Sequence, residues 1–205
     1  IIVGQAGNTR NIFVSRKDVV GADPNLPPAE VIRSCKVLFV DHIGMEGMIR
    51  AAGIARQAGI PVVADIERPV PRLEELLAVV DHPILPLEMA QTITAADEPA
   101  EMLKKLWDAG KSVVVITAGE EGCWYCCDGQ VHHQPAYRVD VVDTTGCGDV
   151  FHGAYAAGLA MGLEVLPRIQ LAAASAAIKA TRRGGQAGAP RLEEVKAFLA
   201  QRVSA

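Results

Sequence analysis

The sequence predicts an α/β fold: a three-layer sandwich around a mostly parallel central sheet. Apolar runs at residues 36–40, 60–65, 83–87 and 112–117 are predicted strands. Helix-forming stretches at residues 45–58, 72–80 and 98–109 lie between them. Strands that alternate with helices form right-handed βαβ units, which place helices against a parallel sheet.

The length and composition of the chain indicate how many domains it has and which partners are unsuited to it. The chain has 205 residues, half of them hydrophobic and few aromatic, which predicts one domain over residues 1–205 with an aliphatic core. The net charge of −4 argues against a nucleic-acid surface. No apolar run reaches the about 18 residues that suggest a membrane span.

The first elements are predicted from local signals. Residues 1–5 and 11–15 are short β runs that indicate a hairpin, and residues 23–28 form a turn-rich link. Residues 36–40 show little alternation, as expected of a strand covered on both faces. The helix at residues 45–58 ends at Gly59, and that at 98–109 has one apolar side, formed by Met102, Leu103, Leu106 and Trp107.

The second half begins with another hairpin. Strands at residues 123–127 and 130–134 flank Asp128-Gly129, a pair that supplies the positive φ angles of a tight turn. Residues 137–142 are β-branched and predict a further strand. Three helices follow: one through Leu159, one opened by Pro167, and one at residues 191–203 with an inward apolar face.

The five cysteines are predicted to be structural thiols. Cys123 and Cys126 have CxxC spacing, but no second pair follows at zinc-finger spacing. The odd count and the lack of a secretory signal favour a reducing, cytoplasmic setting. The start at Ile1, without Met, suggests a chain entered part-way through a strand.

Residues 143–153 contain the stretch that indicates a chemistry. Gly146 and Gly148 flank Cys147, so the backbone can turn sharply at the start of a helix and expose N–H groups there. Asp149 stands at the same positive helix end. An anion site beside a carboxylate suits phosphoryl transfer to an alcohol. Helix-capping acids and Gly-x-Gly turns are also common without function, so these residues alone leave both interpretations open.

The sequence does not match two other nucleotide-binding motifs. The glycines at 146, 148 and 153 do not have the Gly-x-Gly-x-x-Gly spacing of dinucleotide-binding folds. Gly110-Lys111-Ser112 resembles the end of a Walker A loop, but Lys105 occupies the position of the earlier glycine.

The run Asp143-Thr-Thr-Gly-Cys-Gly-Asp149 closely resembles the C-terminal signature of the ribokinase-like, PfkB-type carbohydrate kinases, Asp-Thr-x-Gly-Ala-Gly-Asp. Cys147 replaces the usual alanine. The resemblance extends over about residues 37–199. It implies an anion hole at Gly146, Cys147 and Gly148, Asp149 as general base, and ATP with Mg²⁺ as cofactors.

The same resemblance implies a nucleotide site and a cation site. Residues 117–122 resemble the family's Thr-x-Gly-x-x-Gly segment, which assigns nucleotide contacts to Thr117, Gly119, Glu120 and Gly122. A simple strand-to-hairpin turn is the alternative. The loop at residues 181–186, with Gly184, would border the nucleotide, and K⁺ is implied near the carbonyls of Asp143 and Thr145. Arg182 and Arg183 are expected to be solvated charges.

Ligand sites in parallel sheets lie beyond the carboxyl ends of the strands. This rule predicts that Asp41, His42, Asp65, Glu88 and Thr117 face a common crevice with the Asp143–Asp149 turn. Alone, each could equally be a cap or a solvated loop charge.

Three departures from the family pattern bear on the substrate. The family's sugar-binding Gly-Gly segment and most of its lid have no match, so residues 1–22 are interpreted as a lid-related hairpin. Around residue 88 the Asn-x-x-Glu motif is lost, and Glu88 is a weak substitute as the magnesium or phosphate contact. Asp-x-Asn-x-Arg is represented only by Asp65-Ile66-Glu67-Arg68.

The leading hypothesis is an ATP-dependent sugar kinase, ketose-type by its His152-Gly153 and Gly184-Gly185-Gln186 variants. A small-molecule sugar is its substrate, and the protein is expected to be a homodimer without membrane or nucleic-acid partners. A nucleoside kinase of the same fold and a non-catalytic nucleotide- or sugar-binding module are the alternatives.

Overall fold

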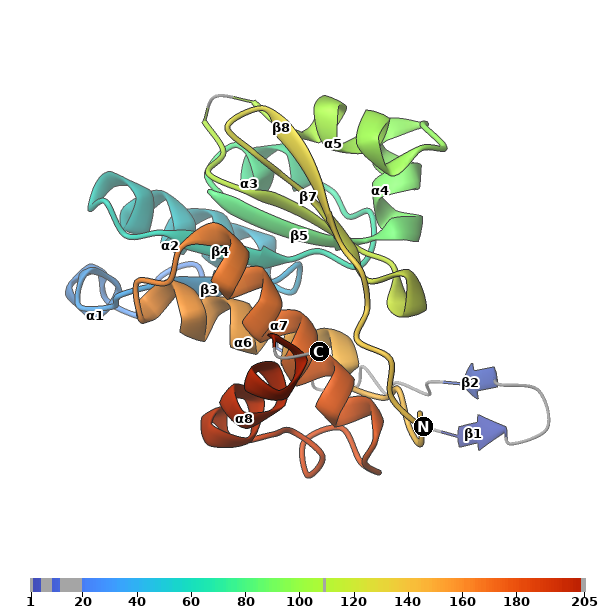
Figure 1. Ribbon diagram of the computed structural model, residues 1–205. Coiled ribbons are helices and arrows are strands. Elements are labelled where there is room, and N and C mark those ends of the chain that lie inside the picture. Colours follow the sequence, from blue (N-terminus) through green and yellow to red (C-terminus); the bar gives the residue numbers. More distant parts are fainter. Residues whose placement is uncertain (1, 5–8, 12–19, 109, 204–205) are drawn as a thin grey trace.

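The computed structural model describes residues 2–4, 9–11, 20–108 and 110–203. It has a six-stranded sheet in the order β3-β4-β5-β6-β7-β8, built from Leu38–Val40, Val62–Asp65, His82–Pro86, Val114–Thr117, Cys123–Cys127 and Gln130–Gln134 (Figure 1). Strands β3 to β6 pair in parallel, and β7 and β8 add antiparallel pairs. The predicted fold class is confirmed.

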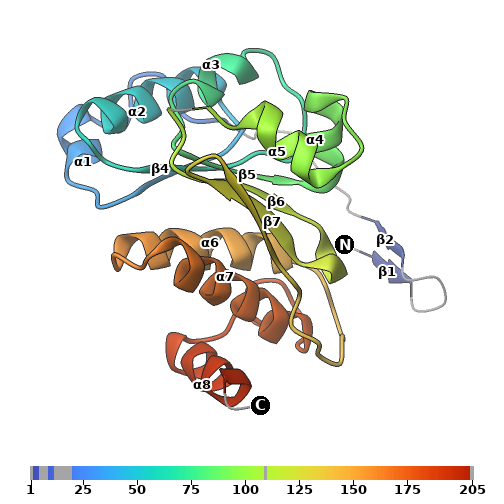
Figure 2. The same ribbon diagram turned by 45° about the horizontal axis from the view of Figure 1, so that its top comes forward.

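Helices cover both faces of this sheet. Figure 2 shows α2 to α5 on one face and α6 and α7 on the other, with α8 outside α7. The helices are α1 Ala29–Arg33, α2 Met45–Gln57, α3 Leu73–Leu77, α4 Leu87–Thr94, α5 Pro99–Leu106, α6 Cys147–Ala160, α7 Val165–Ala180 and α8 Leu192–Val203. The sequence did not reveal α1 and α4. None of the described helices is long and apolar enough to cross a membrane.

Alternate residues of the strands fill two cores. Val62, Leu85 and Ile116 pack beneath α2 to α5, whereas Val63, Ile84 and Val115 pack against α6 and α7, as expected for a sheet covered on both faces. Cys126 belongs to the first core and Cys123 to the second. Burial raises the pKa of the Cys123 thiol to about 12. The two thiols therefore face away from each other, which supports a structural role.

The two hairpins agree with the local signals. Asp128 and Gly129 have φ of 50° and 73° and join β7 to β8, as predicted. Near the amino terminus β1 (Ile2–Gly4) pairs with β2 (Thr9–Asn11) in a separate two-stranded sheet. The second strand thus begins earlier than expected, and residues 12–15 lie outside the described residues.

Two predictions about strands are wrong. Residues 137–142 form no strand: the N–H groups of Val142 and Asp143 instead donate to the carbonyl of Ala180, at the end of α7. The β-branched composition is local, whereas this partner is distant in sequence. The strand predicted at residues 36–40 forms as β3, but it is not fully covered on both faces, because Phe39 is 43% exposed.

Candidate active site

The signature turn, residues 143–149, leads into α6. Gly146 is the residue before the helix and has φ of 78°, the left-handed region that favours glycine. The N–H of Cys147 donates to the carbonyl of Thr144 (3.2 Å) and that of Val150 to Gly146 (3.0 Å). Gly148 and Asp149 occupy the second and third helical positions, where N–H groups have no acceptor within the helix. These N–H groups and the helix dipole favour an anion here.

The carboxylate of Asp143 fixes the shape of the turn. Its Oδ1 accepts a hydrogen bond from the N–H of Thr145 (2.8 Å), and its Oδ2 accepts one from the N–H of Gly184 (2.9 Å). These two backbone bonds lower the pKa of Asp143 to about 2. One side chain therefore joins the signature turn to the loop after α7.

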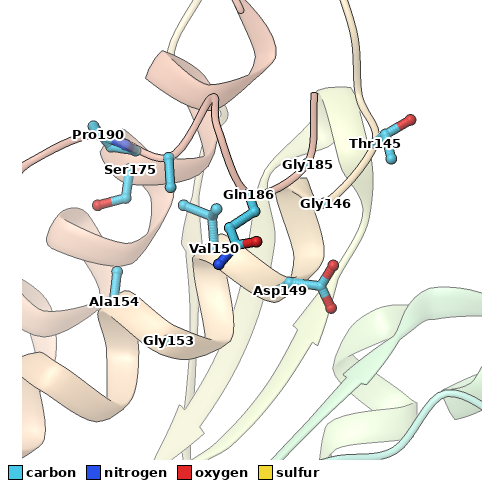
Figure 3. A pocket seen from close by; sticks show the side chains of 11 residues that line it. Thr145, Gly146, Asp149, Val150, Gly153, Ala154, Ser175, Gly185, Gln186 and Pro190 are labelled. Carbon is cyan, nitrogen blue, oxygen red and sulfur yellow. The ribbon is translucent and has the colours of Figure 1, made fainter. Parts of the chain in front are cut away.

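Close backbone packing explains the glycine at 146. A Cβ added there would lie 2.9 Å from the Cα of Gly185, so any side chain would separate the two segments. Beside this contact is a cavity of about 650 Å³ between the start of α6, the middle of α7 and the loop that ends at Pro190. Figure 3 shows Gly146 next to Gly185 and Val150 next to Gln186, with the carboxylate of Asp149 pointing away from Gln186.

The predicted site residues are only partly brought together. The cavity lining includes Gly146 and Asp149, and also Thr145. The other predicted site residues in this part of the chain are not among its lining residues: Cys147, Gly148, Asp143, Thr117, Gly119, Glu120, Gly122 and Gly184. Residues 119–121 form a single 3₁₀ turn after β6. The backbone structure alone explains why residue 122 is a glycine. Its φ is 92°, and an added Cβ would lie 2.1 Å from the carbonyl oxygen of Gln134.

Glu88 and Thr117 lie at the same edge of the sheet. Glu88 is in the first turn of α4, directly after β5, and the last residue of that strand, Pro86, pairs with Thr117. Glu88 is not among the residues that line the cavity. Its role at magnesium or phosphate stays a prediction.

His152, which the sequence indicated only as a family variant and not as a site residue, lies one turn after Asp149 and is 4% exposed. Its Nδ1 is 2.6 Å from the carbonyl oxygen of Gly148; a carbonyl accepts, so Nδ1 donates. Its Nε2 is 3.4 Å from Oδ1 of Asp65, at the end of β4. That distance is long for a hydrogen bond. The i, i+3 spacing from Asp149 was the signal that could have indicated this position.

The charges around Asp65 extend the site across the sheet edge. Burial raises the pKa of Asp65; His152 and His42 oppose this rise, and the negative charges of Glu67 and Asp149 add to it. His42 in turn accepts a hydrogen bond from Nε of Arg68 (2.7 Å). The charges of His42 and Asp149 thus both act on Asp65. A common crevice formed by these residues stays a prediction.

Arg182 is not a free solvated charge. Its guanidinium pairs with Glu194 of α8 at 2.5 Å, with both side chains partly exposed. An exposed pair contributes little stability, about 0–1 kcal/mol, but it connects the loop after α7 to the last helix.

Comparison with known proteins identifies the family. The model of the pfkB family carbohydrate kinases matches residues 1–192. A deoxyribokinase of Salmonella typhi is 27% identical over 92% of this chain and 62% of its own length. The crystal structure of a Thermotoga maritima ribokinase is 25% identical, with a TM-score of 0.78 over 88% of this chain and 62% of that one.

A structure from E. coli in complex with ATP and Mg²⁺ shows the same fold at 22% identity, with a TM-score of 0.76 over 88% of this chain and 64% of that one. The chain spans about three fifths of the length of the proteins that it matches. The match of one family model over residues 1–192 shows that the chain belongs to the PfkB family of carbohydrate kinases.

Proposed function

We propose that this chain supplies the nucleotide-binding and catalytic part of an enzyme that transfers a phosphoryl group from ATP to a sugar hydroxyl. The observation that carries the proposal is the placement of Asp149. It lies in the first turn of α6, on the wall of the cavity and next to the glycine turn. A base beside an anion site is what phosphoryl transfer to an alcohol requires.

The cavity fits a nucleotide. Its size is that of an ordinary small-molecule site, and the backbone contact between Gly146 and Gly185 excludes side chains from the position expected for phosphate. In this proposal the triphosphate lies at the N–H groups of Gly146, Cys147 and Gly148. Thr117, Gly119, Glu120, Gly122 and Gly184, which do not line the cavity, are proposed to contact the rest of the nucleotide outside it. Mg²⁺ bound with ATP would neutralise phosphate charge. Glu88 is the residue proposed to contact the Mg²⁺ or the phosphate.

In the proposed reaction, the carboxylate of Asp149 accepts the proton of the sugar hydroxyl as the hydroxyl oxygen forms a bond to the γ-phosphorus. The bond from that phosphorus to the β–γ bridging oxygen breaks, and ADP leaves with the electron pair. Charge that develops on the transferred group is stabilised by the backbone N–H groups and by the α6 dipole. The bonds from Asp143 to Thr145 and Gly184 hold those N–H groups in place before substrate binds.

The acceptor is proposed to be a sugar, held partly by residues that these 205 do not include. The deoxyribokinase and the ribokinase compared above are named for sugar acceptors. The carboxyl ends of β3 and β4 present His42, Asp65 and Arg68 as polar groups. A nucleoside acceptor is compatible with the same signature but is less favoured. The third alternative, a non-catalytic binding module, predicts nucleotide binding without turnover.

A homodimer formed through the β1–β2 hairpin is also proposed. The hairpin is a two-stranded sheet apart from the main one, and free strand edges favour pairing with another chain. Light scattering of the purified protein would measure the molar mass; a monomer mass would contradict this part of the proposal.

The activity test uses Asp149→Asn in the protein expressed from its native coding region. Sugar-dependent ADP release should fall by about 10²–10⁴, the usual contribution of a general base, while ATP affinity stays close to that of the parent. Asp140→Asn, an exposed acid nearby, is the matched control and should leave the rate unchanged. An undiminished kcat in Asp149→Asn would exclude the proposed base, and ATP binding without turnover of any sugar or nucleoside would favour the binding module.

A further inference from the structure

Lys179, the second-last residue of α7, is a fully buried lysine. Its side chain has 0% exposure, although lysines are almost never fully buried unless their charge is paired. A buried ammonium must find oxygen partners that replace water. Those partners indicate what the side chain does.

The ammonium joins the signature turn to the loop after α7. Its Nζ donates to the carbonyl of Asp143 (2.7 Å) and to that of Arg182 (3.1 Å), and lies 3.9 Å from Oδ2 of Asp143. The stem is enclosed as well, since a Cβ added to Gly188 would lie 3.1 Å from its Cδ. One positive charge therefore sits among two carbonyl oxygens and a carboxylate.

The same carboxylate already holds the neighbouring backbone. Asp143 accepts from the N–H groups of Thr145 and Gly184. Asp143 and Lys179 thus form a single polar cluster that binds residues 143–145 to residues 182–184. Gly146 follows this cluster directly and contacts Gly185, so the cluster determines where the anion-binding turn lies relative to the cavity wall.

The monovalent cation that the family resemblance implies does not fit this arrangement. K⁺ is expected at the carbonyls near Asp143 and at the loop of residues 181–186, with oxygen ligands. Here the oxygens of Asp143 and Arg182 are hydrogen-bonded to a covalently attached cation of the same charge. A second cation among them would be repelled at short range in a poorly solvated site.

We propose that the ammonium of Lys179 takes the place of the monovalent cation and holds the signature turn in its anion-binding shape, so that nucleotide binding needs no K⁺. Lys179 is a positioning residue, because it contacts the turn and not the cavity lining. The inference about ATP rests on the proposed function. The inference about the cation rests on the Lys179 contacts alone.

The test compares the protein with Lys179→Met in KCl and in choline chloride at equal ionic strength. For the unmodified protein, Tm should be the same in the two salts, and the Kd for ATP·Mg²⁺ should agree within about twofold. Both follow because no ion is linked to folding or binding. Lys179→Met should lower Tm by about 5 °C and weaken ATP binding about tenfold in choline, because charge-assisted hydrogen bonds are lost. K⁺ should restore part of both effects, because the oxygens that Lys179 used remain.

Lys111→Met is the matched control. Lys111 is also well covered, at 6% side-chain exposure, and its partner is Asp108 in the loop before β6. Whatever stability this variant loses, K⁺ should not restore it, and its ATP affinity should equal that of the parent.

Two results would overturn the proposal. One is a saturable rise of the parent's Tm with K⁺, which would show a separate ion site; this measurement decides the question even if Lys179→Met fails to fold in both salts. The other is a folded Lys179→Met that binds ATP as tightly as the parent in choline. A parent that binds no ATP in either salt would contradict the proposed function instead, while its Tm would still decide the cation question.

Discussion

The two sides of the proposed active site are built differently. The phosphate side comprises residues 142–149 and 179–188, and its polar contacts are mostly hydrogen bonds to the backbone. Asp143 accepts hydrogen bonds from two N–H groups, the carbonyl of Ala180 accepts two, and Lys179 donates to two carbonyls. On the acceptor side, the carboxyl ends of β3 and β4, His42 Nδ1, Asp65 Oδ1 and His152 Nε2 are buried without a hydrogen-bond partner among the described residues. Phe39 beside them is 43% exposed.

In the proposed function, this difference separates a preorganised phosphate side from an acceptor side that is not preorganised. Backbone N–H groups fixed by a carboxylate and an ammonium cost little to arrange when phosphate arrives. Buried polar atoms without partners are costly unless something satisfies them, so the acceptor side is expected to be completed by groups that the described residues do not supply. Substitutions on the two sides should therefore have different effects.

The largest expected difference concerns two glycines with the same backbone conformation. Gly146 and Gly162 have φ of 78° and 73°, but a Cβ at 146 meets the backbone of Gly185 at 2.9 Å, whereas nothing lies within 4 Å of one at 162. Gly162→Ala should cost about 1–2 kcal/mol, the left-handed penalty alone. Gly146→Ala should cost about 1–3 kcal/mol more from the steric contact and should weaken ATP binding, which Gly162→Ala should not.

Urea unfolding gives both free energies, and calorimetry with ATP·Mg²⁺ gives the affinities. Equal destabilisation by the two variants, with equal ATP affinity, would mean that the packing of Gly146 against Gly185 does not shape the phosphate side.

A smaller effect, of opposite sign on the two sides, is expected in the pH dependence of stability. The pKa of Asp143 is lowered to about 2, so its stabilising contribution is present above pH 4 and is lost as the pH falls through 2. The pKa of Asp65 is raised, mainly by burial, so its contribution is present below pH 4 and is lost as the pH rises through its folded value. Asp143→Asn should therefore destabilise at pH 7, whereas Asp65→Asn should stabilise or be neutral.

Urea midpoints of the parent and the two variants between pH 3 and pH 7 would measure this. The Asp143→Asn deficit should shrink toward low pH. A deficit of equal size at every pH would show that the charge of Asp143 is not what holds the turn.

The sequence predicted what depends on local signals. The Asp128-Gly129 hairpin has the expected strands, and α6 begins directly after the Gly146 turn. The proposed phosphate side follows from these elements and from a motif that is contiguous in the chain. The α1 and α4 helices were missed, although α3 and α5, which have the same lengths, were predicted. Such short segments give little periodicity, so their prediction depends on flanking signals.

Contacts between distant residues could not be predicted in the same way. Residues 137–142 have strand composition, yet their backbone bonds go to Ala180. The Lys179–Asp143 contact joins residues 36 apart, and His152 meets Asp65 across the sheet edge. Each depends on how α6 and α7 pack together, which no local pattern of the chain encodes.

The comparison of the two sides is tested most directly by sugar-dependent ADP release from residues 1–205 expressed alone, over a panel of sugars with saturating ATP and Mg²⁺. Phosphate positioning without acceptor positioning gives little catalysis, so the account predicts ATP binding with no sugar-dependent turnover above background. Turnover at an ordinary kinase rate, about 1–100 per second, would contradict it and would show that the described chain already holds its acceptor.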